Sequence, residues 1–247
     1  GTGKTAAFAL PLLTQIDLAD ASPQVLVICP TRELAVQVAE SFQKYAADLP
    51  GFHVLPVYGG QEYRVQLRAL KRGSHVIVGT PGRIKDHIQR GTLKLSNIRS
   101  VVLDEGDEML NMGFVDDIES ILGGLPDIRQ TLIFSATFPK EIKRIASKYQ
   151  KDPIQIHIKE KTEVVEAIRQ TYCLIHNNDK LVAMTRFLEV ENVDAAIIFV
   201  RTKLETTELS DKLLARGHSV GYINGDMKQS VREDVIKAVK SGKIDIL

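Results

Sequence analysis

The apolar residues of this chain gather in short runs that are separated by longer segments with helical periodicity. The runs are rich in Val and Ile and end at turn-forming residues, which is typical of buried β-strands. Strands that alternate with amphipathic helices form parallel sheets covered by helices. The pattern therefore predicts an α/β fold.

The first part of the chain contains six predicted strands and six predicted helices. The strands are expected at 25–29, 53–57, 75–78, 100–104, 131–135 and 154–158. The helices are expected at 4–16, 33–49, 63–71, 82–89, 116–122 and 140–149. Pro11 is expected to kink or shorten the first helix, because proline lacks the backbone donor that the helix needs.

The alternation breaks at 159–168, a charged segment without a convincing strand, which we interpret as a linker. It divides a first domain at 1–158 from a second domain at 169–247. In the second domain, strands are expected at 170–175, 195–200, 219–223 and 244–247, with helices at 180–189, 204–214 and 230–239. No helix follows the last strand, so the second domain is expected to be truncated.

Composition restricts the possible functions without naming one. A chain of 247 residues with 44% hydrophobic content can form two α/β domains. The formal net charge is only +1, so any binding of RNA or DNA must depend on local contacts. Cys29 and Cys173 both lie in apolar runs, which predicts buried thiols and a reducing, cytoplasmic setting. No apolar run is long enough to span a membrane, although a lost targeting segment stays possible.

Three carboxylates follow the apolar run at 100–103, namely Asp104, Glu105 and Asp107. Carboxylates at the end of a buried strand are typical ligands of Mg²⁺ beside a nucleotide. An acidic turn or the N-terminus of a solvated helix is the alternative interpretation of this cluster alone.

The chain begins with Gly-Thr-Gly-Lys-Thr, the last part of a phosphate-binding loop. In such a site the loop amides and Lys4 hold the β- and γ-phosphates, and Thr5 and Asp104 bind the metal. Glu105 is then the candidate to orient the attacking water. Gly-Lys-Thr alone occurs by chance, but the loop and the acidic cluster together favour a site that hydrolyses a nucleoside triphosphate.

Further polar loops follow the predicted strands, at 30–33, 59–60 and 80–83. Helix N-terminal amides, hydroxyls and arginines in such loops can bind successive phosphates of a nucleic-acid strand. Taken singly, each loop also fits ordinary helix capping by Thr or Pro. The turn at 135–137, Ser-Ala-Thr, ends another strand and either couples the nucleotide site to a bound strand or only caps a helix.

In this order, the segments at 1–5, 30–35, 59–60, 80–83, 104–107 and 135–137 resemble the motifs of the first core domain of DEAD-box RNA helicases. The segments at 197–202 and 229–232 resemble motifs of the second core domain. The resemblance covers essentially the whole chain and is greatest to the bacterial cold-shock-associated type.

The resemblance implies two RecA-like P-loop NTPase domains, the first without its initial strand and the second truncated. It implies local, ATP-driven unwinding or remodelling of short RNA duplexes, with ATP and Mg²⁺ as cofactors. RNA would be bound through its backbone with little sequence preference. Ribosome or RNA-decay partners would bind through accessory tails outside this chain, and the location would be cytoplasmic.

The resemblance also assigns individual residues. Nucleotide binding falls to Gly1, Thr2, Gly3, Lys4, Thr5, Asp104 and Glu105, with Thr5 and Asp104 on the metal. The catalytic set is Lys4, Asp104, Glu105, Ser135 and Thr137. RNA contacts fall to Pro30, Thr31, Arg32, Gly60, Thr80, Pro81, Gly82, Arg83, Thr202, Gly225, Gln229 and Arg232. Asp107 is expected to hydrogen-bond to the turn at 135–137.

Two departures from the family pattern affect the expected activity. Gly106 replaces the usual alanine, which is expected to loosen the backbone but to leave the chemistry intact. The family's adenine-reading segment and its γ-phosphate arginines fall outside the 247 residues. Because an arginine finger contributes about 10³ to 10⁵ in rate, the isolated chain is expected to hydrolyse ATP poorly.

Other function classes remain open at this stage. The chain could be an ATP-gated RNA clamp or chaperone without efficient turnover, or a DNA helicase on the same scaffold. Competition between RNA and DNA strands would separate the last case, because 2′-hydroxyl contacts distinguish them. A metabolic kinase is the least favoured class, since the sequence indicates no site for a substrate that would accept the phosphoryl group.

Overall fold

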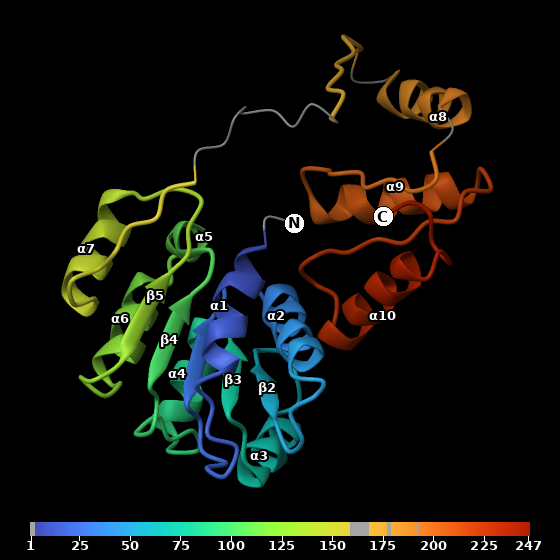
Figure 1. Ribbon diagram of the computed structural model, residues 1–247. Helices are drawn as coiled ribbons and strands as arrows, with labels where there is room; N and C mark the ends of the chain where they lie inside the picture. The colour runs from blue at the N-terminus through green and yellow to red at the C-terminus, as the bar shows by residue number, and fades with distance from the viewer. Residues whose placement is uncertain (1–2, 159–167, 177–178, 192) are drawn as a thin grey trace. The chain divides into compact units, whose positions relative to one another are not determined.

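The computed structural model describes residues 3–158, 168–176, 179–191 and 193–247 (Figure 1). The chain separates into two compact units, Gly1–Gln155 and Ile156–Leu247. Most of the predicted linker, residues 159–167, lies outside the described residues. Each unit is therefore described by itself.

The first unit is built on a five-stranded parallel sheet with the order β2-β3-β1-β4-β5. The strands are β1 (Val25–Ile28), β2 (Val54–Val57), β3 (Val76–Gly79), β4 (Ser100–Leu103) and β5 (Gln130–Ile133). Their register is aligned, because Ile28 pairs with both Gly79 and Leu103, and Leu103 pairs with Ile133. The loops that follow all five strands therefore leave the sheet at one edge, which we call the carboxyl edge.

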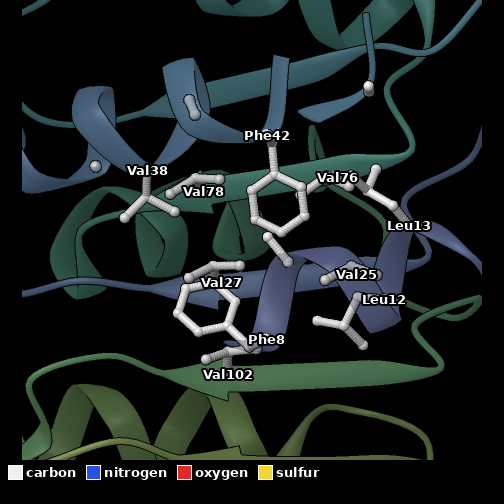
Figure 2. Close-up of a cluster of buried hydrophobic side chains, with 14 of the residues drawn as sticks. Phe8, Leu12, Leu13, Val25, Val27, Val38, Phe42, Val76, Val78 and Val102 are labelled. Carbon is white, nitrogen blue, oxygen red and sulfur yellow. The ribbon is translucent and has the colours of Figure 1, made fainter. Parts of the chain in front are cut away.

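Helices cover both faces of this sheet because successive strand residues point to opposite sides. Val25 and Val27 share one buried cluster with Phe8 of α1 (Lys4–Leu13) and Phe42 of α2 (Arg32–Tyr45), as Figure 2 shows. Complete burial of a side chain such as Phe42 stabilises the fold by about 1.5–3 kcal/mol.

The opposite face packs against a second cluster. Leu26 and Ile28 lie there with residues of α4 (Pro81–Gln89) and α6 (Val115–Gly123). The remaining helices of this unit are α3 (Tyr63–Arg72), α5 (Gly106–Asn111) and α7 (Lys140–Tyr149).

The structure confirms five of the six strands predicted for the first unit. The sixth, at 154–158, is wrong, since these residues are exposed and form no strand. Pro11 lies inside α1, and the helix ends at Leu13 rather than at residue 16, so the expected shortening is observed. Sequence reasoning missed α5, whose six residues are too few to display helical periodicity.

The second unit contains the three predicted helices, α8 (Lys180–Val190), α9 (Lys203–Leu214) and α10 (Gln229–Lys240). Its predicted strands are only partly formed. Ile246 makes isolated parallel bridges to Ala196 and Val220, so the segments at 195–200, 219–223 and 244–247 are neighbours but too briefly paired to count as strands.

The strand predicted at 170–175 is wrong, because these residues are exposed and form no strand. Cys173 is consequently exposed, against the prediction of a buried thiol, whereas Cys29 is buried as predicted. Among the residues that the structure describes, no helix is long and apolar enough to cross a membrane.

Candidate functional site

The polar segments singled out in the sequence of the first unit meet at the carboxyl edge of its sheet. The segment after β1 and the acidic cluster after β4 lie close together, as the pKa of the Cys29 thiol indicates. Burial raises this pKa well above its ordinary value, and the charges of Asp104 and Glu105 after β4 raise it further. The loop that begins at Pro30 therefore starts beside the acidic cluster.

The phosphate-loop residues stand at the N-terminus of α1. Gly1 and Thr2 lie outside the described residues. Gly3 is the N-cap with φ 74°, a left-handed conformation that glycine adopts without strain. Gly3 has no side chain that could cap the first amides of α1, and Lys4 and Thr5 are half-buried in its first turn. Backbone amides at the positive end of a ten-residue helix suit a phosphate.

Asp104 lies at the end of β4 and is 4% exposed. Burial raises the pKa of its carboxyl group to about 6, and the neighbouring Glu105 adds to this rise. The Lys4 ammonium opposes the rise, which places its charge within electrostatic reach of Asp104. A buried, disfavoured carboxylate is a position where a cation would be strongly stabilising.

The donor set fits Mg²⁺ rather than a softer metal. Asp104 and Thr5 would offer hard oxygen ligands, whereas no group of three His, Cys, Asp or Glu residues in the described ranges, this site included, could hold a metal without other ligands. Mg²⁺ usually takes one or two protein ligands and completes its shell with phosphate and water. A metal at this position would accordingly depend on a bound nucleotide.

Glu105 is one of two non-glycine residues with positive φ among the described residues. It has φ 55° and ψ 53° as the N-cap of α5. The left-handed region costs an L-residue about 1–2 kcal/mol, and such strain gathers at functional sites. The turn directs the chain away from β4 immediately after Asp104.

Asp107 connects the acidic cluster to the turn after β5. Its Oδ2 accepts hydrogen bonds from the backbone N–H of Thr137 at 2.9 Å and from the Thr137 hydroxyl at 2.7 Å. The Asp107 backbone N–H donates to Ser135 Oγ at 3.0 Å. Partial burial raises the pKa of Asp107, but these hydrogen bonds outweigh it and lower the pKa to about 2. The predicted bonding of Asp107 to this turn is confirmed.

The three loops predicted to bind RNA also leave the sheet at the carboxyl edge. Thr31 Oγ1 caps α2 by accepting from the Leu34 N–H at 3.2 Å. A side-chain carbon added at Gly59 would lie 3.6 Å from Arg32 Nη2, so the Arg32 guanidinium borders the Gly59–Gly60 turn.

The third of these loops starts α4. Thr80 is its N-cap but makes no side-chain capping bond, and Pro81 occupies the first turn. Gly82 is exposed and Arg83 is half-buried. The Thr31 hydroxyl caps its helix, whereas the Thr80 hydroxyl makes no capping bond to α4.

Two of the four candidates in the second unit, Gly225 and Arg232, lie at one turn. Arg232 donates from Nη2 to the Asn224 carbonyl at 3.2 Å, and a carbon added at Gly225 would lie 3.3 Å from Lys203 Cε. Thr202 forms a capping box with Glu205, so its hydroxyl is already occupied. Gln229 begins α10 and donates to Glu233 at 3.2 Å.

Comparison with known proteins decides the family. Residues 1–145 match the DEAD/DEAH box helicase family, and residues 179–247 match the helicase conserved C-terminal domain. The chain belongs to the DEAD/DEAH box helicases. The resemblance stated from the sequence motifs is confirmed, and the fold is that of RecA-like domains.

Similar relatives of this DEAD-box chain include two curated proteins named ATP-dependent RNA helicase DeaD. The one from Mycobacterium tuberculosis is 53% identical over 247 residues, which is all of this chain and 44% of the relative. The one from Escherichia coli is 48% identical over the same residues and 39% of its own length. The chain thus spans about two fifths of the length of these relatives.

Solved structures agree with the assignment. A DEAD box protein from Methanococcus jannaschii is 40% identical with a TM-score of 0.62, and the match covers all of this chain and 66% of that protein. Dbp5 from Saccharomyces cerevisiae, bound to RNA and ADP BeF3, is 32% identical with a TM-score of 0.86, and 62% of it is covered.

Gly106 has a packing partner in this DEAD-box chain. A Cβ at this position would lie 3.0 Å from Ile142 Cδ1 of α7, tighter than ordinary contact. The alanine that is usual in the family would require Ile142 to shift by a few tenths of an ångström. The glycine therefore lets α7 approach α5 closely.

The raised pKa of Asp104 predicts the pH dependence of stability in the absence of metal. The folded state binds the Asp104 proton more tightly than the unfolded state, whose pKa is near 3.8. The stabilisation that this proton gives the folded state is fully present below about pH 4. It is lost as pH rises through about 6, which lowers the free energy of unfolding by up to about 3 kcal/mol.

Asp104→Asn is accordingly expected to stabilise the metal-free protein by about 2–3 kcal/mol at pH 7 and by little at pH 3.5. Urea unfolding at both pH values, without and with Mg²⁺ and ATP, measures the effect. Equal effects of the substitution at both pH values would contradict it. Mg²⁺ with ATP should stabilise the wild type but not the variant.

The strained backbone at Glu105 gives a separate stability prediction. Glu105→Gly is expected to be about 1 kcal/mol more stable than Glu105→Gln, because glycine adopts positive φ freely. Taking Glu105→Gln as the reference removes the effect of the charge. Asp152→Gly is the matched control, since Asp152 is exposed, lies outside the site and has φ 45°. Thermal unfolding measures both, and no gain at Glu105 would refute the strain.

Sequence reasoning missed a set of polar residues behind the RNA candidates, namely Gln66, His87, Tyr63 and Thr92. Gln66 and His87 are both 0% exposed. The available signal was a polar residue on a buried stripe, because Gln66 lies four residues before Leu70 on α3.

Proposed function

We propose that the chain is the core of an ATP-dependent RNA helicase that couples ATP hydrolysis to local separation of RNA strands. The observation that carries the proposal is the Asp107–Ser135–Thr137 connection at the carboxyl edge. It bonds the acidic cluster after β4 directly to the turn after β5. A change in charge or position at the nucleotide would thus be transmitted through bonded atoms.

In this mechanism the residues of the first unit divide the work. Lys4 and the first amides of α1 hold the β- and γ-phosphates. Mg²⁺, held by Thr5 and Asp104, would neutralise charge that develops on the phosphates. Glu105 orients the attacking water and takes its proton. Ser135 and Thr137 pass the change to the RNA-binding loops.

The RNA strand is bound through its backbone by residues of the three loops, Pro30, Thr31, Arg32, Gly60, Thr80, Pro81, Gly82 and Arg83. In the second unit, Thr202, Gly225, Gln229 and Arg232 complete the strand contacts. At the start of α9 the capping box occupies the Thr202 hydroxyl and the N–H groups of Thr202 and Glu205, so the donors would be the N–H groups of Lys203 and Leu204. Phosphate contacts of this kind carry little sequence information, which suits a chain of net charge +1.

The proposal keeps the domain boundaries expected from the sequence, 1–158, 159–168 and 169–247. A cytoplasmic location and ribosome or RNA-decay partners stay predictions from the resemblance.

The test uses a hybrid helicase, in which these 247 residues replace the matching stretch of the full-length Escherichia coli relative. We expect ATP hydrolysis that single-stranded RNA stimulates, together with ATP-dependent separation of a short RNA duplex. Equal stimulation by DNA would support a DNA helicase instead. Retention of RNA with ATP but without turnover would support the clamp.

A further inference from the structure

A buried polar cluster joins α3 to α4 behind two of the proposed RNA-binding loops. At its centre lie the side chains of Gln66 and His87, both fully buried. Buried polar groups are costly unless they are hydrogen-bonded, so each bond in such a cluster constrains its partners.

Every hydrogen-bonding position of the Gln66 amide is occupied. Its Nε2 donates to the Tyr58 carbonyl at 2.8 Å and to Gln61 Oε1 at 2.8 Å. Its Oε1 accepts from Arg83 Nη1 at 3.3 Å and lies 2.9 Å from His87 Nε2. Because the Tyr58 carbonyl can only accept, the orientation of the amide is fixed, and His87 Nε2 must be a donor.

His87 is itself held in one orientation. Its Nδ1 lies 2.8 Å from Thr92 Oγ1, and the Thr92 hydroxyl is also 3.0 Å from the His87 carbonyl, so both ends of His87 contact this one group. The Tyr63 ring stacks on the His87 imidazole at 4.6 Å between centroids, and the Arg90 guanidinium lies over the Tyr63 ring. Burial lowers the pKa of His87, the charges of Arg83 and Arg90 lower it further, and Asp86 opposes them. These effects favour the neutral form of the ring.

The bonds of Gln66 reach two separate RNA-binding candidates. Gln61 directly follows the Gly59–Gly60 turn, where Gly60 has φ 86°. Arg83 belongs to the loop that begins α4. Arginine has much rotamer freedom, and fixing its guanidinium before binding reduces the entropy that binding would otherwise cost.

We propose that Gln66, oriented by His87, is a positioning residue that fixes Arg83 and the Gly59–Gly60–Gln61 turn relative to each other as one binding unit for the RNA backbone. This inference rests on the proposed function of the carboxyl edge. It adds residues that touch no RNA and act only through Arg83 and the turn.

A double-mutant cycle tests the coupling in the 247-residue chain. The single variants are Gln66→Met and Arg83→Gln, and the affinity for a fluorescent single-stranded oligouridine is measured at fixed salt. We expect Gln66→Met to weaken binding by about five- to tenfold. In the Arg83→Gln background the same substitution is expected to add less than about twofold. Penalties that multiply in the double variant would overturn the proposal.

Gln24→Met is the matched control for lost buried hydrogen bonds. Gln24 is 1% exposed and fully bonded to Asp17 and Asp20, but it precedes β1 at the opposite edge of the sheet. It should lower the melting temperature as Gln66→Met does while leaving RNA affinity unchanged. Equal losses of RNA affinity in the two variants would reduce Gln66 to a purely structural role.

A measurement without RNA separates this inference from the proposed function. In ¹⁵N-arginine spectra of the free protein, the Arg83 side-chain N–H signal should shift and lose order in Gln66→Met but not in Gln24→Met. An unchanged Arg83 signal would overturn the positioning role. A wild type that binds no oligouridine, with the Arg83 signal responding as expected, would instead refute the RNA-binding function of the edge.

Discussion

Replacing Glu105 by Gln in the hybrid helicase is expected to lower RNA-stimulated ATP turnover by about 10³-fold. Glutamine has the same size and preserves the turn after β4, but it cannot take a proton from the attacking water. Binding should survive, because Lys4 and the α1 amides do not depend on the Glu105 charge. The result would separate the chemical step from the binding of ATP and RNA.

Steady-state ATP hydrolysis measures the loss, and titrations with a fluorescent ATP analogue and with RNA measure retained binding. Glu108→Gln is the matched control, since Glu108 is an exposed carboxylate on α5 only three residues away. It should change turnover by less than twofold. A Glu105→Gln enzyme that hydrolyses ATP at the wild-type rate would remove Glu105 from the mechanism.

Asp107→Ala in the hybrid helicase is expected to lower ATP-driven RNA strand separation by about a hundredfold and ATP hydrolysis by considerably less. The substitution removes both hydrogen bonds that the Asp107 carboxylate accepts from Thr137. Bonds to a charged acceptor contribute about 1.5–3 kcal/mol each, and partial exposure places the expected loss at the lower end. The turn after β5 would then no longer follow changes at the acidic cluster.

Unwinding of a short fluorescent duplex and ATP hydrolysis are measured on the same samples. Asp107→Asn should recover part of the coupling, because an amide oxygen can still accept from Thr137. Parallel losses of hydrolysis and unwinding in Asp107→Ala would mean that Asp107 supports the nucleotide site itself. The coupling role would then be wrong.

The fold of the first unit was largely predictable because its three central strands, β1, β3 and β4, are buried on both faces. Val25–Ile28 and Ser100–Leu103 are continuous apolar runs, the form that a central parallel strand takes. Parallel strands send their following loops to one edge, so a site at the carboxyl edge followed from the alternation alone. The Asp107 bond to the turn at 135–137 was predictable only through the family resemblance.

The remaining features depend on contacts that no local pattern encodes. Gln66 carries no motif, and its role follows from the residues that surround it in space. The apolar residues at 170–175 satisfied the strand pattern, but a strand also needs neighbours to pair with, and the described residues provide none there. For the same reason Cys173 was wrongly predicted to be buried.

The unequal environments of the two thiols give this protein a natural handle for chemical labelling. Cys29 is buried beside the acidic cluster, and its raised pKa keeps it from forming the reactive thiolate. Cys173 is exposed in the second unit. A maleimide dye should therefore attach at Cys173 alone, without any prior cysteine replacement. Its fluorescence would report how the second unit responds when nucleotide and RNA are added, with the chemistry of the first unit left unmodified.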